Sequence, residues 1–301
     1  MLQLIYRIIY SENINYVLRN INKLLSPFLP NSIRIPPSGI IKAKNSNGNS
    51  IKFSLNQSSG FGSVIFWDGY QTFEYTAIFI KLIKKVHSFY DIGANLGYYT
   101  LIAASENSGI RIVCFEPATG PAFYLNRNIT INGISNITVE AIALSNIEGT
   151  IDFYEIRNKK YKFLEHCLAG ESNAGSITTG RNFHISKVRT TTLDQYVATN
   201  NEREIDLIKM DTEGTEHLIL SKSTMVLTQM KPIIICETLF NVIEEQLEEI
   251  MTGFGYEFYN HIGTGLKKVT SIKRTQDDGV RNCFFVHPSK KHLIEEFISV
   301  E

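Results

Sequence analysis

Short apolar runs alternate with helix-like stretches over residues 88–301 of this 301-residue chain. Each run is long enough for one strand, and most stretches between them have apolar residues at helical spacing. Such alternation is typical of an α/β fold in which a mostly parallel sheet is covered by helices on both faces. We predict a seven-stranded sheet formed by SFYDIG, RIVCFE, ITVEAIAL, IDLIKMD, PIIICET, GYEFYNHI and NCFFVHP.

The segment FYDIGANLGYYT places a glycine-rich turn directly after the first of these runs. Gly93 and Gly97 are spaced G-x-x-x-G, with Asp91 before them and Asn95 between them. A dinucleotide-binding turn carries G-x-G-x-x-G instead, so the pattern argues against NAD and against an oxidoreductase. Because glycine has no Cβ, we expect a ligand to lie very close to the backbone of this turn.

Acidic residues follow several of the predicted strands. In an open α/β sheet the carboxyl ends of the strands border the ligand crevice, so these side chains are expected to converge on one site. That much carboxylate disfavours a phosphate and favours a cationic or hydroxyl-rich ligand, and Glu116 can accept both hydroxyls of a ribose. S-adenosylmethionine meets these demands. The acidic strand ends are Asp91, Glu116, Asp211, Glu213 and Glu237.

Charge and cysteine content narrow the class of protein further. Thirty basic and thirty acidic residues give a formal net charge of zero, so the chain lacks the summed positive field that attracts nucleic acid. The four cysteines form no C-x-x-C pair, and three of them lie in apolar runs. We therefore expect a cytoplasmic protein without structural zinc and without a nucleic-acid substrate.

Two segments precede the predicted domain at residues 88–301. Residues 1–32 have apolar positions at helical spacing and no signal-cleavage site, which predicts an amphipathic helix. Residues 33–87 are predicted as a β-rich prefix. The apolar face of the helix is expected to pack on the body or on a second subunit; the alternative is peripheral membrane contact, with basic side chains near anionic lipid. These basic side chains are Arg7, Arg19 and Lys23.

The ordered motifs resemble the FkbM family, class I S-adenosylmethionine-dependent methyltransferases that mostly methylate hydroxyls, often on sugars or secondary metabolites. DIGANLGYYT is similar to the first motif of the family, CFEPATGPAFYLNRNITING to its acidic second strand and following helix, and ALSNIEGTIDFY to its third block. TTLDQYV with IDLIKMDTEGTEHLILSKS is similar to its most distinctive segment. The likeness extends from about residue 74 to residue 240.

The resemblance implies a Rossmann-like methyltransferase fold, S-adenosylmethionine as cofactor, and a small-molecule or glycan acceptor that is O-methylated. The first motif would hold the methionine part of the cofactor, Glu116 the ribose, and Pro117 would shape the turn that follows. Asn128 and Asn132 match a pair that is either structural or close to the adenine. The matched first-motif residues are Asp91, Gly93, Asn95, Gly97 and Thr100, and the matched residues after the fourth strand are Asp211, Glu213, Gly214 and Glu216.

Methylation of an alcohol by a sulfonium requires an oxygen in line with the S–CH3 bond and a base that takes its proton. Asp211 is the first candidate for this base, or for orienting the acceptor, because it ends the central strand on the cofactor side. Glu213 and Glu237 follow, and His217 is a further candidate because imidazole titrates near neutrality. As alternatives, Glu213 and Glu216 can stabilise a helix N-terminus, and His217 can cover the first helical turn.

The same carboxylates also allow a metal site. Asp211, Glu237 and Asn241 can supply oxygen ligands to Mg²⁺, but nothing in their spacing demands it, and a metal-free site is predicted.

Two further segments can contribute to acceptor binding. FWDGYQTFEYT has aromatic faces suited to stacking on a sugar, with packing against the sheet as an equal alternative. Residues 155–187 are polar and without clear periodicity, and loops of this length often form binding lids. The residues concerned are Trp67, Tyr70, Phe73, Glu74 and Tyr75 in the first segment, and His166, Ser172, Ser176 and His184 in the second.

A catalytically inactive cofactor-binding or assembly subunit with the same fold is the alternative function. Its N-terminal helix would make the partner contact. The complete set of acidic strand ends and turn glycines argues against it, because an idle site would not need them.

Overall fold

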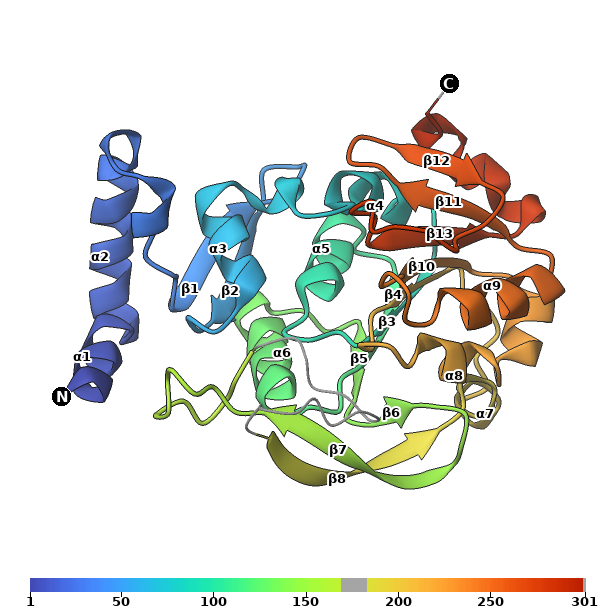
Figure 1. Ribbon diagram of the computed structural model, residues 1–301, viewed down its shortest axis with the longest axis horizontal. Helices are drawn as coiled ribbons and strands as arrows, with labels where there is room; N and C mark the ends of the chain where they lie inside the picture. Colours follow the sequence, from blue (N-terminus) through green and yellow to red (C-terminus); the bar gives the residue numbers. More distant parts are fainter. Residues whose placement is uncertain (169–182, 300–301) are drawn as a thin grey trace.

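The computed structural model describes residues 1–168 and 183–299 and has an eight-stranded sheet at its centre (Figure 1). The five strands from β10 to β5 are parallel, and β13 and β12 run against their neighbours. In spatial order the strands are β12 (Leu266–Val269), β11 (Glu257–His261), β13 (Asn282–Val286), β10 (Ile233–Glu237), β9 (Leu207–Met210), β3 (Ser88–Ile92), β4 (Arg111–Phe115) and β5 (Ile137–Glu140).

The predicted fold class, a mostly parallel sheet with helices on both faces, is confirmed. The sheet has one strand more than predicted because β12 pairs antiparallel with β11. This strand, LKKV, has apolar residues only at its two ends, which is too weak a periodic signal to mark a strand.

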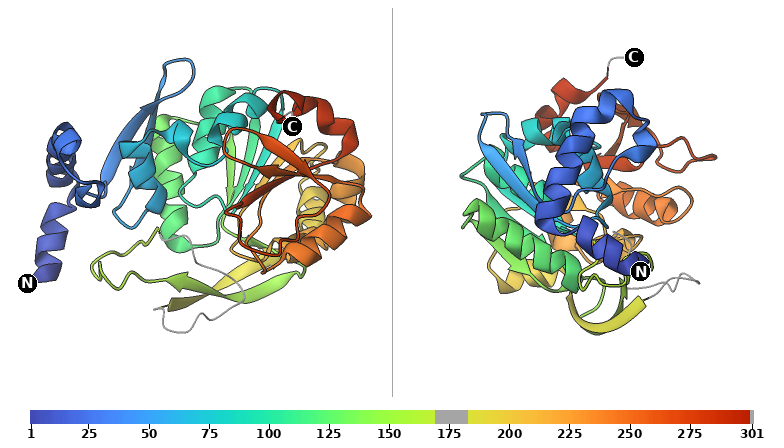
Figure 2. Two further views of the ribbon diagram at one scale, coloured as in Figure 1. Left: turned by 45° about the horizontal axis from the view of Figure 1, so that its top comes forward. Right: turned by 90° about the vertical axis from the view of Figure 1, so that its left-hand side faces the viewer.

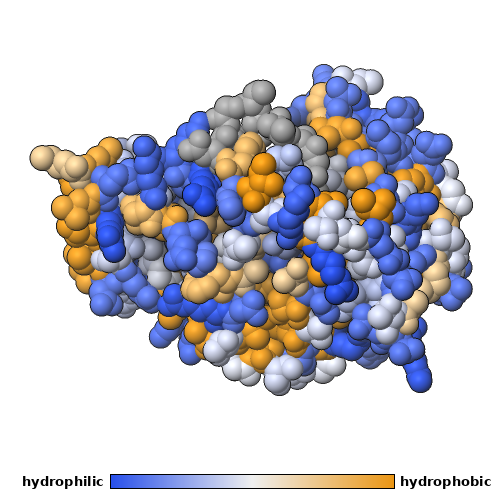
Figure 3. All heavy atoms as spheres, turned by 90° about the horizontal axis from the view of Figure 1, so that it is seen from below, coloured by the Kyte–Doolittle hydropathy of each residue, from blue (hydrophilic) through white to orange (hydrophobic). Residues whose placement is uncertain are grey.

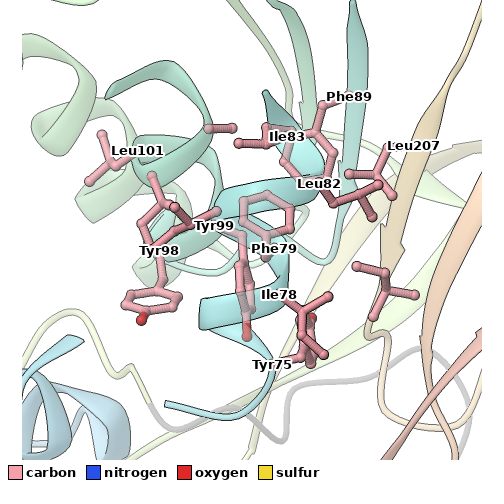
Figure 4. Packing of buried hydrophobic residues seen from close by; sticks show 14 of the residues in the cluster. Tyr75, Ile78, Phe79, Leu82, Ile83, Phe89, Tyr98, Tyr99, Leu101 and Leu207 are labelled. Carbon is pink, nitrogen blue, oxygen red and sulfur yellow. The ribbon is translucent and has the colours of Figure 1, made fainter. Parts of the chain in front are cut away.

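Successive residues of each central strand enter two different cores. Phe89 belongs to the core under α4 (Thr76–Ile83) and α5 (Tyr98–Glu106), whereas its neighbour Tyr90 belongs to the core on the opposite face. Figure 4 shows the first core, where Tyr75 and Tyr99 stack at 4.7 Å between ring centroids. The opposite core is covered by α7 (Leu193–Thr199), α8 (Glu216–Leu220) and α9 (Glu244–Gly253). Strands buried on both faces explain the continuous apolar runs of the sequence.

A three-stranded sheet lies beside the main one, in the order β6 (Ala143–Leu144), β8 (Phe183–Thr191), β7 (Gly149–Ile156) (Figure 1). The expectation of a loop over residues 155–187 is wrong at both ends, because Glu155 on β7 pairs with His184 on β8. Only three of the nine residues of β8 are buried and only three are apolar, so its periodicity is weak. Ser172 and Ser176 lie outside the described residues.

The N-terminal part contains two helices, α1 (Leu2–Ile9) and α2 (Glu12–Leu25), where one was expected. Arg19 is 2% exposed and therefore buried, whereas the membrane alternative required it to face anionic lipid. No described helix is both long and apolar enough to cross a membrane.

The prefix forms the antiparallel hairpin β1 (Gly39–Lys44) and β2 (Ser50–Leu55), followed by α3 (Gly60–Trp67). Two asparagines of α6 (Thr119–Asn132) attach β2 to the main body. Asn128 accepts from Ser54 N and donates to Ser54 O, and Asn132 does the same with the backbone of Lys52. Both asparagines therefore have a structural role. Short helical turns occupy Ser26–Phe28, Asn31–Ile33, Tyr70–Thr72, Val226–Met230, Pro288–Leu293 and Glu295–Phe297.

Candidate functional site

A cavity of about 440 Å³ lies at the carboxyl ends of β3, β4 and β9. Its volume falls within the roughly 300–1,000 Å³ typical of small-molecule sites. The walls combine the predicted strand ends with the prefix, which the sequence offered as a contributor to acceptor binding, and with the small sheet, which it did not predict. Lining residues that carry the argument below are Glu74, Gly93, Asn95, Glu116, Lys209 and Asp211.

The turn glycines are required by the protein's own chain. A Cβ on Gly93 would lie 1.9 Å from the carbonyl oxygen of Asp211, and one on Gly97 would lie 2.6 Å from Leu125 Cδ1. Both glycines have positive φ, at +73° and +88°. The bare backbone therefore lets the loops after β3 and β9 touch each other, and Gly93 also borders the cavity.

Glu116 ends β4 with both carboxylate oxygens held by the backbone. It accepts hydrogen bonds from Asn95 N at 2.7 Å and Ala118 N at 2.8 Å. Burial raises the pKa of Glu116 to about 7, against the opposing effect of these two hydrogen bonds. Pro117 follows in the cavity wall.

Lys209 is a buried cation that sequence reasoning missed. Its ammonium donates to Gly93 O at 2.7 Å and lies 3.6 Å from Asp91 Oδ1 and 3.5 Å from Asp211 Oδ2. Burial alone would lower the pKa of Lys209, but the surrounding carboxylates, led by Asp211 and Asp91, outweigh burial and raise it. The available signal was a lysine inside an otherwise apolar strand.

Asp91 and Thr100 lie behind the cavity wall and do not line it. Asp91 is 1% exposed, and its Oδ2 accepts from Thr100 Oγ1 at 2.6 Å. Burial raises the pKa of Asp91, while Lys209 and Thr100 oppose that effect. Through Lys209, Asp91 is linked to the carbonyl of Gly93, so it acts on the turn from within the core.

Acidic side chains gather at another part of the cavity, where Asp211, Glu213 and Glu74 line it. Partial desolvation by the cavity wall raises the pKa of Glu74 to about 7, and the Asp211 carboxylate adds to the shift. Tyr99 Oη donates to Glu74 Oε2 at 3.3 Å. Glu74, Asn95 and Glu213 also have positive φ, at 41°, 53° and 59°, and backbone strain of this kind concentrates at functional sites.

Three other predicted residues lie around this group and are not in the cavity wall. Glu237 ends β10, where burial and the carboxylates of Asp211 and Glu213 raise its pKa. Glu216 accepts from Thr212 N at 2.6 Å at the start of α8, which is the helix N-terminal role considered for it. His217 lies on α8, and burial lowers its pKa.

The remaining candidates divide between packing and the cavity. Phe73 lines the cavity, whereas Tyr70 and Tyr75 are buried in the core. Trp67 packs edge-on against Phe66, and His166 stacks on Phe123 at 4.2 Å between ring centroids. Asn241 donates its backbone N–H to Glu244. Within residues 1–168 and 183–299, no three His, Cys, Asp or Glu side chains are grouped as a metal site.

The strand order and the cavity at the carboxyl ends of β3, β4 and β9 define a class I methyltransferase fold. The family model described as the methyltransferase FkbM domain matches residues 91–258. The chain therefore belongs to the FkbM methyltransferase family, whose methyl donor is S-adenosylmethionine. The resemblance and the cofactor expected from the sequence are confirmed.

Several solved structures are similar to this chain. Methyltransferase FkbM from Methylobacillus flagellatus KT is 16% identical with a TM-score of 0.42, and the match covers 67% of this chain and 43% of that one. The METTL16 methyltransferase domain is 13% identical with a TM-score of 0.44, covering 82% and 86% of the two chains. M. jannaschii TYW2 in complex with AdoMet is 13% identical with a TM-score of 0.38, covering 84% and 89%. The chain thus spans less than half of the Methylobacillus protein, and no curated protein matches it.

The residues present fit the donor. Carboxylates at one part of the cavity suit a sulfonium cation, and the carboxylate of Glu116 in the wall suits ribose hydroxyls as hydrogen-bond donors. The apolar side chains of Phe115, Ile142 and Leu144 line the same cavity and suit an adenine ring.

Proposed function

We propose that this methyltransferase O-methylates a hydroxyl of a glycan or a similar small-molecule acceptor. The observation that carries the proposal is that Glu74 and Asp211 line the same cavity as Glu116. An alcohol is a poor nucleophile without a base, and two carboxylates near the reacting centre can supply that base and orient the hydroxyl.

The donor-binding roles proposed here follow from the wall of the cavity. Glu116 accepts the ribose hydroxyls, and the turn from Gly93 to Gly97 holds the methionine part. Asp91 and Thr100 support that turn through Lys209 and α5, without contact to the donor. The bound donor supplies an activated methyl group on a sulfonium, whose positive charge Asp211 and Glu213 stabilise by proximity.

Glu74 is the base in this proposal, and Asp211 orients the acceptor. A general base is most effective when its pKa lies near the working pH, and the pKa of Glu74 is raised to about 7. Tyr99 donates to Glu74 Oε2 and fixes the position of this carboxylate. Asp211 lies beside Lys209, where its carboxylate is held close to the turn that borders the cavity.

Aromatic surface in the cavity supports a glycan or another hydroxyl-rich ring as acceptor. Phe61 and Phe73 line the cavity from the prefix, the same part of the chain that contributes Glu74. Their rings lie 5.8 Å apart between centroids, and such faces bind the apolar C–H side of a sugar.

Matched acceptors test the proposal. The protein is incubated with deuterated-methyl S-adenosylmethionine and with pairs of sugars that differ only by a hydroxyl or an amine at one carbon. We expect a labelled methyl ether on the hydroxyl sugars, detected by mass spectrometry, and its loss in Glu74→Gln. Labelling of the amine alone would overturn O-methylation. Donor binding with no turnover on any acceptor would favour the inactive subunit instead.

A further inference from the structure

The helix α2 is attached to the body by its polar side. Its buried residues are Asn15, Arg19 and Asn22, which recur at helical spacing and form what we call the inner polar stripe. Arg19 donates to Ser38 O at 2.7 Å and to Ile40 O at 2.6 Å. These bonds join the helix to the strand β1 and to the chain leading into it.

Two asparagines complete this attachment. Asn15 accepts from Ser38 N at 2.7 Å and donates to Pro36 O at 3.1 Å, and Asn22 accepts from Ile35 N at 2.8 Å. Rotating α2 so that its apolar side faced the body would turn these three polar side chains toward solvent and leave the backbone groups that they bind without partners. The orientation of the helix is therefore held by specific hydrogen bonds.

The apolar side of the helix pair is consequently exposed to solvent. Figure 2 shows α1 and α2 as a layer at one end of the molecule, and Figure 3 shows hydrophobic residues gathered at that end. Leu24 is 78% exposed and Phe28 is 85% exposed. Soluble monomers rarely expose contiguous apolar patches of this kind. This outer apolar face consists of Leu2, Leu4, Ile5, Ile8, Ile14, Val17, Ile21, Leu24, Leu25 and Phe28.

A basic segment lies directly against α1. Gln3 donates to Lys160 O at 2.9 Å and accepts from Lys162 N at 3.1 Å, and Tyr6 packs edge-on against Tyr161. From residue 157 to residue 165 this segment carries four basic residues and one acidic residue. The four, all exposed, are Arg157, Lys159, Lys160 and Lys162.

We propose that the outer apolar face of α1 and α2, together with this basic segment, docks on the surface of an anionic lipid membrane. The argument for a membrane is charge complementarity. A symmetric dimer through this face would bring the same patch of both copies together, and with it the two basic segments, which like charge disfavours. An anionic leaflet attracts the segment while the apolar side chains enter the headgroup boundary.

Vesicle flotation with the full chain tests the proposal. The wild type is expected to float with vesicles containing about one third phosphatidylglycerol, and much less with pure phosphatidylcholine. Raising NaCl from about 0.05 to 0.5 M should weaken flotation, because the electrostatic part is screened. Lack of flotation with the anionic vesicles would overturn the proposal.

Variants test whether vesicle binding depends on this face and this basic segment or on nonspecific adsorption of the protein surface. Ile21→Gln with Leu24→Gln should weaken partition by about tenfold or more, and Arg157→Gln with Lys162→Gln by about threefold to tenfold. Ile147→Gln with Lys222→Gln is the matched control, because Ile147 and Ile21 are both 51% exposed and Lys222 is exposed. Equal effects of control and test variants would contradict the proposal. Concentration-dependent dimerisation that Ile21→Gln abolishes, without vesicle binding, would assign the face to a second copy instead.

Discussion

The carbonyl oxygen of Asp211 lies where a side chain on Gly93 would have to stand, 1.9 Å from the position of its Cβ. The contact joins the loops that follow β3 and β9, and both loops line the cavity. Lys209 stabilises the same contact, because its ammonium donates to Gly93 O at 2.7 Å. The glycine of the first motif and the aspartate of the later signature therefore form one structural unit.

Gly93→Ala should destabilise the protein strongly. The substitution combines positive φ with an overlap against backbone, and together these are expected to cost about 2–5 kcal/mol. Gly133→Ala is the matched control, because Gly133 also has positive φ, at 65°, but no atom lies within 4 Å of its Cβ position. It should cost about 1–2 kcal/mol, measured by urea unfolding. Equal losses in the two variants would show that the contact with Asp211 carries no energy.

Lys209→Met should destabilise the protein by about 3–5 kcal/mol, because it leaves the buried Asp91 carboxylate without its cation. Lys222→Met, at an exposed position, should change the free energy of unfolding by less than about 0.5 kcal/mol. Unfolding in urea at neutral pH measures both.

The pH dependence of Lys209→Met provides a second test. Without the ammonium, burial raises the pKa of Asp91 further, so the folded state holds a proton that the unfolded state releases. Stability of this variant should therefore fall as pH rises above the unfolded pKa of an aspartate, and the deficit relative to wild type should shrink on acidification. A deficit that is constant with pH would show that Asp91 is not the group left unpaired.

Asn128→Ala should remove the attachment of β2 to the body. Its side chain bonds to both backbone groups of Ser54 and to Leu96 O at 2.9 Å, so three buried backbone groups lose their partner. We expect a loss of about 3 kcal/mol or more in thermal or urea unfolding. Asn126→Ala is the control on the same helix, because Asn126 is exposed and its side chain donates to Ala122 O within the helix. A small effect of Asn128→Ala would show that other contacts stabilise the attachment of the prefix to the body.

The sheet and the strand-end acids were predictable because each rests on a local pattern. Glu116 and Asp211 directly follow apolar runs, and parallel strands bring their carboxyl ends to one edge. The roles of Lys209 and Glu74 were not predictable in this way. Lys209 is recognised as a buried cation only when Asp91 from another strand lies beside it, and Glu74 reaches the cavity from a prefix with no strand of the main sheet.

The orientation of the N-terminal helix also depends on contacts between distant residues, which a local sequence pattern does not reveal. Helical spacing correctly predicted an amphipathic helix, but it cannot tell which side faces the body. That side is decided by Arg19, whose partners are the carbonyls of Ser38 and Ile40. Backbone carbonyls carry no signature in the sequence, so packing of the apolar face on the body was wrong for α2, whereas packing on a second subunit stays a prediction.

Affinity for S-adenosylhomocysteine should depend on the ionisation of Glu116. The carboxylate accepts hydroxyl hydrogen bonds, and its pKa is raised to about 7, so protonation below pH 7 removes the binding-competent form. The dissociation constant should rise by about fivefold between pH 7 and pH 6, as expected when only the ionised fraction binds and the pKa is about 7. Calorimetric titration across this range measures it.

Glu116→Gln is the control for the other groups that titrate near neutrality. It should bind more weakly than wild type at pH 8 and show a nearly flat dependence between pH 6 and pH 8, to within about twofold. A variant that retained the full pH dependence would show that a different group, such as a histidine, controls binding.

Glu74→Gln should lower kcat by about 10²- to 10⁴-fold while changing donor affinity little, because a general base acts in the transition state. At saturating donor, where the ionisation of Glu116 no longer limits binding, the kcat/KM of the wild type for the acceptor should fall as pH drops below about 7, because Glu74 becomes protonated, and the variant should lack this limb. Tyr99→Phe tests the contribution of the hydrogen bond from Tyr99 to the pKa of Glu74. The hydroxyl of Tyr99 lowers the pKa of Glu74, so its removal should shift the acid limb to higher pH with kcat largely retained. If Asp211→Asn alone removed the limb, Asp211 would be the base and Glu74 would only orient the acceptor.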